Sequence, residues 1–451
     1  MAAVSMLALV AGCTSLTRQP PAAPAASAAA PVQAKSVSAP APAPAKAEWP
    51  ENPSLQDYLD YAVAHNPGLA SAYDQWKAAM ERVPQARSLD DPRVSYRVAV
   101  ARMMRTHEVA VEQMLPWFGK LDLRAAVAVE EANAAHRRAE VERLKLEAEV
   151  KNAYYEYYYL SRSIAVVREN LTLVKYLEEV ALVRYRTASA GHPDVIRSQV
   201  ELGKLDDDLR TLEDSRGSAA ARLNAMLNRP AEAPLPWPAA IREEPVDVPD
   251  EQVLAWMRET SPELKGLGHD IARERQAIEL ARKDFYPDIG VGVGYMNFRE
   301  IDESQNGHMV VGMVSVTLPI WRDKYAAGVR EAESRHQAAL KSRADRENRL
   351  AAEAKMAAYQ LRDAHRKIGL YRDNLVPKAR QSLEATLAAY RAGSVPFADL
   401  VDAERLLLEF QLDYERALAN HGQRLAELER IVGRELPRGS APSAPAPESP
   451  K

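Results

Sequence analysis

The residues of this sequence that could act together chemically are carboxylates, spaced so that they would lie on one face of a helix. Asp399 and Asp402 lie three residues apart, and Glu409 and Asp413 continue the same line. Residues three or four apart share one face of a helix, so these side chains would form an acidic stripe. If several copies of the stripe met around an axis, the carboxylates would attract cations and raise one another's pKa values. An ordinary solvated acidic face explains the same spacing.

The single cysteine, Cys13, is the second candidate for chemistry. It follows an apolar segment, residues 1–12, that ends in Ala11 and Gly12. Small residues directly before a lone cysteine resemble the lipobox of bacterial lipoproteins, in which the signal is removed and the cysteine is acylated. A buried thiol is the alternative, but the Ala/Pro-rich tract that follows cannot form a core around it. We expect a signal peptide at 1–12 and a lipid-anchored linker at 13–50.

Two details of the N-terminus refine this expectation. No Lys or Arg precedes the apolar segment, although signal peptides carry such residues, which suggests that the true start lies upstream. Thr14 follows the cysteine where, by the rule for lipoproteins, an aspartate would retain the protein in the inner membrane. The sequence therefore predicts the outer membrane as the location.

The remaining composition disfavours several classes of function. The 451 residues carry a net charge of −4 with interleaved signs, which leaves no basic footprint for nucleic acid. One cysteine excludes a disulfide framework and multi-cysteine metal sites. The Gly-rich run at 290–294 lacks the Lys-Ser/Thr of a phosphate loop. With no nucleophile elbow, metal-ligand spacing or paired acid/base motif, we expect neither an enzyme nor a cofactor beyond the lipid.

Long helices must position these residues. Residues 119–187 contain no Pro and only one Gly, at their start, so a continuous helix there would span about 100 Å at 1.5 Å per residue. Residues 325–391 match this segment, with interruptions at Gly328, Gly369 and Pro377. A second helix follows each, at 194–228 and 396–432. Apolar stripes on more than one side of these helices predict neighbours on two sides.

Four alternating segments lie between the helices, at about 92–101, 107–115, 287–298 and 308–320. Alternation over seven to ten residues is typical of transmembrane β-strands, although the strands of a soluble sheet show it too. Four strands cannot close a barrel, and lipid does not tolerate open sheet edges. Membrane strands would therefore require several chains to share one barrel, of 8 strands for two chains or 12 for three.

An internal duplication relates the two halves. Asn66-Pro67 is echoed by Ser261-Pro262 and Tyr185 by Tyr390, at offsets of 195 and 205 residues. The sequence therefore predicts a first repeat at 51–230, a second at 250–436 and a disordered tail at 437–451.

The ordered set of motifs resembles the TolC family of outer-membrane efflux channels over about residues 55–436. The motifs are Ser88-Leu89-Asp90-Asp91-Pro92, Leu115-Pro116-Trp117-Phe118-Gly119, Tyr286-Pro287-Asp288, Leu318-Pro319-Ile320-Trp321 and Tyr390-Arg391-Ala392-Gly393 with Asp399-Leu400-Val401-Asp402. The resemblance implies a mainly α protein with membrane β: long antiparallel helical hairpins forming a periplasmic α-barrel, and four strands per chain in a 12-stranded barrel of a homotrimer.

The resemblance also implies a function and partners. Such a protein passively conducts drugs or metal ions out of the periplasm. It does so as the exit duct of a tripartite pump, with a periplasmic adaptor and an inner-membrane pump, often of the resistance-nodulation-division class. Acylation at Cys13 is similar to the lipoprotein branch that serves drug and heavy-metal pumps. The duct would bear no site for nucleic acid, and the identity of its substrate stays open.

By the same resemblance, the helix ends form a gate at the periplasmic mouth. Asp399 and Asp402 match the aspartates that ring the pore, and Asp194 holds the equivalent place in the first half. Tyr390 matches a tyrosine that ties the closed gate. Val395 stands where the family's best-known pattern has a gate arginine, so we expect closure to depend more on packing.

Two alternatives remain open. A periplasmic helical-hairpin adaptor, or a structural lipoprotein of an export system, also has long helices, but an adaptor would need a lipoyl-like β module and only one hairpin. Soft side chains near the expected hairpin tips suit Cu(I), although Met and His in loops commonly have no such role. They are Met103, Met104, His107, His308 and Met309.

Overall fold

The computed structural model describes residues 53–438, except 102–103, 239–240, 242, 244, 247 and 301–305. The chain divides into Met1–Ala43 and Pro44–Lys451, and every described residue belongs to the second unit. The predicted signal peptide, Cys13 and the linker at 13–50 lie outside the described residues, as does the predicted tail from residue 439 onward.

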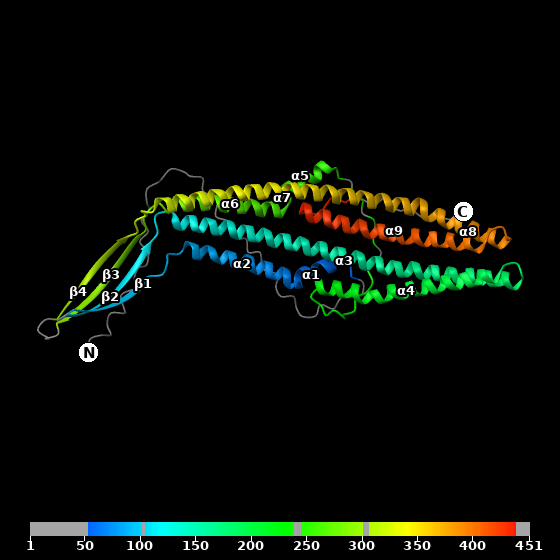
Figure 1. Cartoon of the computed structure of the whole chain (residues 1–451), viewed down its shortest axis with the longest axis horizontal. Helices are drawn as coiled ribbons and strands as arrows, with labels where there is room; N and C mark the ends of the chain where they lie inside the picture. Colours follow the sequence, from blue (N-terminus) through cyan, green and yellow to red (C-terminus); the bar gives the residue numbers. More distant parts are fainter. Residues whose placement is uncertain are drawn as a thin grey trace, which may run out of the picture. The chain divides into compact units, whose positions relative to one another are not determined.

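The second unit contains the same series of elements twice (Figure 1). The first series is α1 (Leu55–His65), α2 (Pro67–Arg87), β1 (Arg93–Ala101), β2 (Met104–Leu115), α3 (Lys120–Arg186) and α4 (His192–Met226). The second is α5 (Asp250–Thr260), α6 (Pro262–Lys283), β3 (Ile289–Glu300), β4 (Asn306–Val316), α7 (Arg322–Leu370), a π-helical turn (Tyr371–Leu375), α8 (Val376–Ala392) and α9 (Phe397–Val432).

Local signals in the sequence explain where the helices begin. Ser54 and Asp57 form a reciprocal capping box at the start of α1, which satisfies two otherwise free backbone donors. Asn66 caps α2 through a bond from the Leu69 amide, and Pro67 occupies the first helical position, where its missing N–H costs nothing. In the second repeat α6 likewise begins with a proline after Ser261.

The second long helix is broken only near its proline. α7 runs without interruption through Gly328 and Gly369, and the π-helical turn follows directly before Pro377. The expected interruption at Gly328 is therefore wrong, whereas the regular helix does give way to a π-helical turn between Gly369 and Pro377. The physical reason is the difference in cost, since a glycine in a helix costs about 1 kcal/mol and a proline about 3 kcal/mol.

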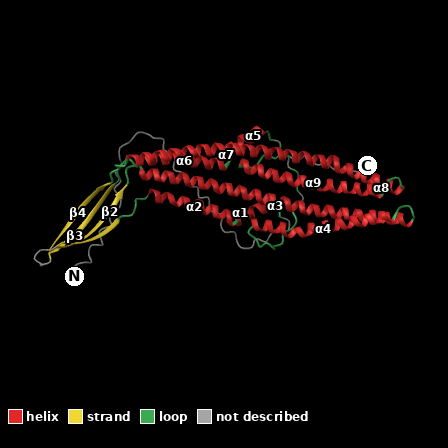
Figure 2. Ribbon diagram, in the orientation of Figure 1, coloured by secondary structure: helices red, strands yellow, loops and turns green. Residues whose placement is uncertain are grey.

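The four strands form one antiparallel sheet in the order β1-β2-β3-β4. Figure 2 shows them in yellow at one end of the helices. The expected limits shift by a few residues: β2 begins at 104, β3 covers 289–300, and β4 covers 306–316 rather than 308–320. The register ends where Ile289 faces Val316, and Pro319 beyond it has no N–H for a ladder hydrogen bond.

The helices lie in a row. α3 contacts α2 and α6, and α6 contacts α7; further along, α3 contacts α4 and α9, and α9 contacts α7 and α8. α3 thus has neighbours on two sides, as its stripes predicted. Among the described residues, no helix is both long enough and apolar enough to cross a membrane.

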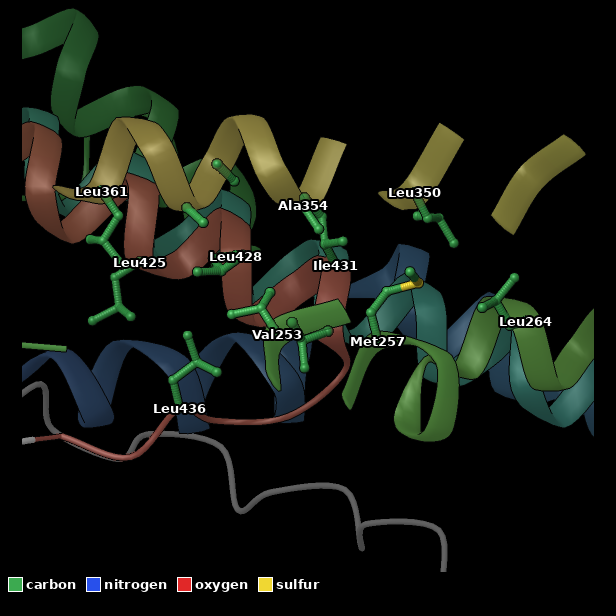
Figure 3. Packing of buried hydrophobic residues seen from close by; sticks show 13 residues of the cluster. Val253, Met257, Leu264, Leu350, Ala354, Leu361, Leu425, Leu428, Ile431 and Leu436 are labelled. Atoms are coloured by element: carbon green, nitrogen blue, oxygen red, sulfur yellow. The ribbon is translucent and has the colours of Figure 1, made fainter. Parts of the chain in front are cut away.

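Apolar clusters hold the row together. The cluster in Figure 3 joins α5, α6, α7 and α9, with Met257, Leu350 and Leu428 almost completely buried. A matching cluster in the first repeat joins α1, α2, α3 and α4, where Tyr157 is fully buried and donates its hydroxyl to the Leu235 carbonyl at 3.1 Å. The duplication in the sequence is therefore also a duplication of the packing.

Candidate functional site

The gate residues that the sequence predicted lie near two turns, one between α3 and α4 and one between α8 and α9. Both turns lie at the ends of the helices that are remote from the sheet. α3 begins five residues after β2 and is 67 residues long, so its end lies about 100 Å from the sheet. The turn at 187–191 joins α3 to α4, and the turn at 393–396 joins α8 to α9. A buried cluster that includes Leu177, Val195, Leu383 and Leu400 packs these four helices together.

Tyr390 and Asp194 meet at these turns. The Tyr390 hydroxyl donates a hydrogen bond to Asp194 Oδ2 at 3.2 Å, which ties the end of α8 to the start of α4. The tyrosine ring is almost fully buried and meets Phe397 edge-on, with 5.3 Å between ring centroids. Burial and the nearby carboxylate raise the pKa of Tyr390 to about 12, so the phenol stays protonated and able to donate.

Arg184, which the sequence did not single out for the gate, completes this contact. Its guanidinium lies 4.4 Å from the centre of the Tyr390 ring and donates to the Tyr390 carbonyl oxygen, and to the Ser189 carbonyl at 3.0 Å. Whether closure depends more on packing stays a prediction, but the structure adds a contact that the sequence did not suggest. An arginine from the end of α3, in the other repeat, lies against the tyrosine.

Asp399 and Asp402 do not join this cluster. Asp399 is exposed in the first turn of α9, where a carboxylate interacts favourably with the helix dipole. The Asp402 side chain is 76% exposed and lies 4.0 Å from Arg405 Nη1. Further along the predicted stripe Glu409 is exposed, whereas Asp413 accepts a hydrogen bond from the Tyr371 hydroxyl at 2.9 Å. The side chains of Asp399 and Asp402 therefore remain exposed near the turn between α8 and α9.

A buried acidic pair lies two turns of helix deeper. Arg405 Nε donates to Glu201 Oε1 at 3.0 Å, and a second guanidinium nitrogen bonds the other oxygen; these bonds hold the pKa of Glu201 below its ordinary value. Glu404 is completely buried, and neither of its carboxylate oxygens has a partner in the part of the chain that the structure describes. Burial, and then the charge of Glu201, raise the pKa of Glu404 to about 7.

The soft side chains near the hairpin tips do not gather. His107 faces Asn297, which faces His308, so both histidines share one face of the sheet. Met309 neighbours His308 along β4 and lies on the other face, opposite Met296. Met103 lies outside the described residues, and Met104 is the first residue of β2. In the described ranges, no group of three or more His, Cys, Asp or Glu side chains could hold a metal ion.

The motifs that flank the strands meet where the sheet joins the helices. Lys120, almost fully buried, lies 2.9 Å from the Asp288 carboxylate. The same carboxylate accepts a bond from the Trp117 amide at 2.8 Å, and the Trp117 ring stacks on Tyr286. The Leu-Pro-Trp motif of one repeat and the Tyr-Pro-Asp motif of the other therefore form one junction.

Comparison with known proteins shows which proteins this chain is similar to. Residues 254–434, from α5 to just past α9, match the family described as Outer membrane efflux protein. The chain is 21% identical over 385 residues to the cobalt-zinc-cadmium resistance protein CzcC of Cupriavidus metallidurans, a match that covers 84% of this chain and 90% of the relative.

Solved structures share the fold. CusC superposes with a TM-score of 0.74 at 15% identity, over 85% of this chain and 92% of the other. The outer membrane protein VceC of Vibrio cholerae superposes with a TM-score of 0.71 at 17% identity, over 84% and 96%. These alignments extend over both repeats, beyond the segment that matches the family. Two hairpins of long helices, one shared sheet and the family match over residues 254–434 agree: the chain has the fold of these outer-membrane proteins and is similar to the outer membrane efflux protein family, in line with the TolC family that its motifs resemble.

Proposed function

We propose that the chain is the exit duct of a tripartite efflux system and that it conducts its substrate passively from the periplasm to the outside. The observation that carries the proposal is a sheet with an exposed apolar face, on which Val94, Val111 and Val293 lie exposed in one row. This sheet is joined to a row of helices about 100 Å long. The sheet suits lipid, and a row one helix thick suits the wall of a tube. An adaptor would instead have a lipoyl-like β module and only one helical hairpin.

A homotrimer follows from the edges of the sheet. β1 and β4 are the outer strands and have no strand beyond them among the described residues. Lipid does not tolerate such edges, so β1 of one copy is proposed to pair with β4 of the next. Three copies of four strands give a barrel of 12, and three rows of helices continue it as an α-barrel in the periplasm.

The helix turns are proposed to be the periplasmic gate. The contact of Tyr390 with Asp194 and Arg184 joins two hairpins of one chain, and separating these hairpins would break it. Asp399 and Asp402 are exposed beside it, and three copies would bring six carboxylates toward the axis. Crowded carboxylates bind cations, so the closed mouth is expected to be sensitive to divalent ions.

Substrate, partners and anchor complete the proposal. The relative CzcC is named a cobalt-zinc-cadmium resistance protein, which favours heavy-metal cations as the substrate. Drugs remain the second substrate class. The partners are a periplasmic adaptor and an inner-membrane pump, of the resistance-nodulation-division class. Cys13 is proposed to carry the lipid that anchors the chain in the outer membrane.

Planar-bilayer recordings test the gate. Divalent cations added on the periplasmic side are expected to block the wild-type current, and Asp399→Asn with Asp402→Asn to remove most of the block. Asp74→Asn with Glu81→Gln is a matched control, because it neutralises two exposed carboxylates of α2. Equal block in all three proteins would refute the assignment of the aspartates.

A further inference from the structure

The sheet sorts its side chains into an apolar and a charged face. Exposed valines and tyrosines, such as Val94 and Tyr295, lie on the apolar face. Arg97 and Glu108 lie on the other face and form an ion pair at 3.1 Å. The strand methionines whose side chains the structure describes all share this charged face: Met114, Met296, Met309 and Met313.

This placement is the reverse of what apolar packing alone would produce. In a membrane barrel apolar side chains collect on the outer face, and the interior is polar. The outer apolar rows of this sheet use valine, isoleucine and tyrosine, whereas methionine stands among arginine, glutamate and serine. The thioether sulfur, which is a weak acceptor and a soft metal ligand, distinguishes methionine from those apolar residues.

One row of the charged face brings two methionines and a carboxylate together. Glu108 faces Met296 across β2 and β3, and Met296 faces Met309 across β3 and β4. Side chains that face each other in an antiparallel pair have Cβ atoms about 5 Å apart, so both long thioethers reach a point between them. Met309 is 48% exposed and Met296 is half-buried. The pair is therefore accessible to an ion.

A second row repeats the arrangement four residues nearer the helices. Glu112 faces Gly292, and Gly292 faces Met313. Because Gly292 has no side chain, the methyl carbon of Met313 lies over it, 3.4 Å from the position that a Cβ would take. Glu112 accepts a hydrogen bond from the Ser315 hydroxyl at 2.7 Å, which draws its carboxylate across β3. Each of the two rows thus combines a carboxylate with a thioether.

We propose that Met296 and Met309 bind a soft monovalent metal cation, Cu(I) or Ag(I), with the Glu108 carboxylate beside it. Thioether ligands favour such ions, whereas Mg²⁺ and Mn²⁺ prefer oxygen ligands. Three copies of the chain in one barrel would place three such pairs at one height of the lumen. That the ion is cargo on its way out rests on the proposed function, since the charged face lines a lumen only in a closed barrel.

Silver binding by the purified full-length protein tests this site. Ag(I) is added as its nitrate in chloride-free buffer, and equilibrium dialysis measures the affinity per chain. Met296→Leu with Met309→Leu conserves side-chain volume and removes both sulfurs. It is expected to weaken silver binding by about tenfold or more, at least the loss that substitutions around a metal site cause. Met80→Leu with Met356→Leu, at exposed methionines of α2 and α7, is the matched control and is expected to keep the affinity.

Two further measurements separate the thioethers from other causes. Met309→Leu alone changes an exposed side chain and is expected to weaken silver binding severalfold. Mn²⁺, which prefers oxygen ligands, is expected to bind the wild type and the double variant alike. Cys13 is present in every variant, so its sulfur cannot produce a difference between them.

Equal silver affinity of the wild type and of Met296→Leu with Met309→Leu would overturn the proposal, and so would an equal loss in the control. The same proteins are also recorded in planar bilayers. Silver binding that depends on the two methionines, in folded protein that never conducts, would contradict the duct and leave the site. Normal conduction with silver affinity that does not depend on them would refute the site and leave the duct.

Discussion

Glu404 provides a quantitative test of how the helix ends pack. It is completely buried without a hydrogen-bond partner in the described chain, and its pKa is raised from 4.5 to about 7. At about 1.4 kcal/mol for each pKa unit, this difference disfavours the ionised carboxylate by about 3 kcal/mol. Glu404→Gln keeps the shape of the side chain and removes the charge, so it should remove this cost.

The pH dependence follows from the direction of the pKa change. The folded protein binds the Glu404 proton more tightly than the unfolded chain, so unfolding releases it between pH 4.5 and about 7. The contribution of Glu404 to stability is therefore fully present below pH 4.5 and is lost as the pH rises to about 7. Glu404→Gln is expected to match the wild type at the acidic end and to exceed it by about 3 kcal/mol at pH 8.

The neighbours of Glu404 define the controls. The charged groups that act on it are Glu201 of α4, which raises its pKa, and Arg405 of its own helix, which lowers it. From α3 and α8 the surrounding cluster receives apolar side chains and the Tyr390 phenol. Glu409→Gln removes an exposed carboxylate from the same helix and should leave the pH dependence unchanged.

Guanidinium titrations of the detergent-purified protein from pH 4.5 to 8 provide the apparent free energy of unfolding. If Glu404→Gln keeps the pH slope of the wild type between pH 4.5 and 7, the reasoning from burial is wrong. A variant that is less stable than the wild type at pH 8 would contradict it equally, because that result would mean that the carboxylate has a partner.

Four further substitutions test other features of the structure. Tyr390→Phe removes the hydroxyl bound to Asp194 and keeps the ring, at a cost of about 1 kcal/mol per chain; single-channel recordings should show a higher open probability. Lys120→Met leaves its aspartate partner without a cation at the junction and should lower the free energy of unfolding by about 3 kcal/mol, whereas an unchanged value would refute a role for the ion pair. Gly433→Ala should destabilise by 1–2 kcal/mol or more, since φ is +82° and a Cβ would lie 2.6 Å from a proline ring carbon. Gly203→Ala, in open space within a helix, should instead stabilise by about 1 kcal/mol, and thermal melts compare the two.

The sequence allowed the elements to be predicted because their signals are local. The absence of Pro and internal Gly marked α3 to within a residue at each end, and the alternation of valines marked the strands. The resemblance to the TolC family made Tyr390 and Asp194 candidates for one gate, and the structure brings them together. The prediction of the elements needed only periodicity and composition along the chain.

The contacts between hairpins could not be predicted in this way. Arg184 reaches Tyr390 over 206 positions, and Arg405 reaches Glu201 over 204, so nothing near any of these residues in the sequence reveals its partner. Glu404 left one local trace, because it lies four residues after Leu400 and three before Leu407, both of which are buried. A charged residue in that position already indicated an unusual environment.

The sequence of the β-hairpins contains a signal against a metal site shared by His308 and Met309. His308 and Met309 are consecutive, and consecutive residues of a strand point to opposite faces. A shared metal site for these two residues was therefore disfavoured by the pattern that predicted the strand. The same rule places His107 on the face of β2 that also bears Val109 and Val111.

The central claim is that this chain forms a conducting duct, and single-channel recording in a planar bilayer tests it most directly. Full-length protein purified from membranes, folded and reconstituted without partners, is predicted to produce discrete current steps that divalent cations reduce from the periplasmic side. Folded protein that is demonstrably inserted in the bilayer and yet passes no current under any ionic condition would contradict the account.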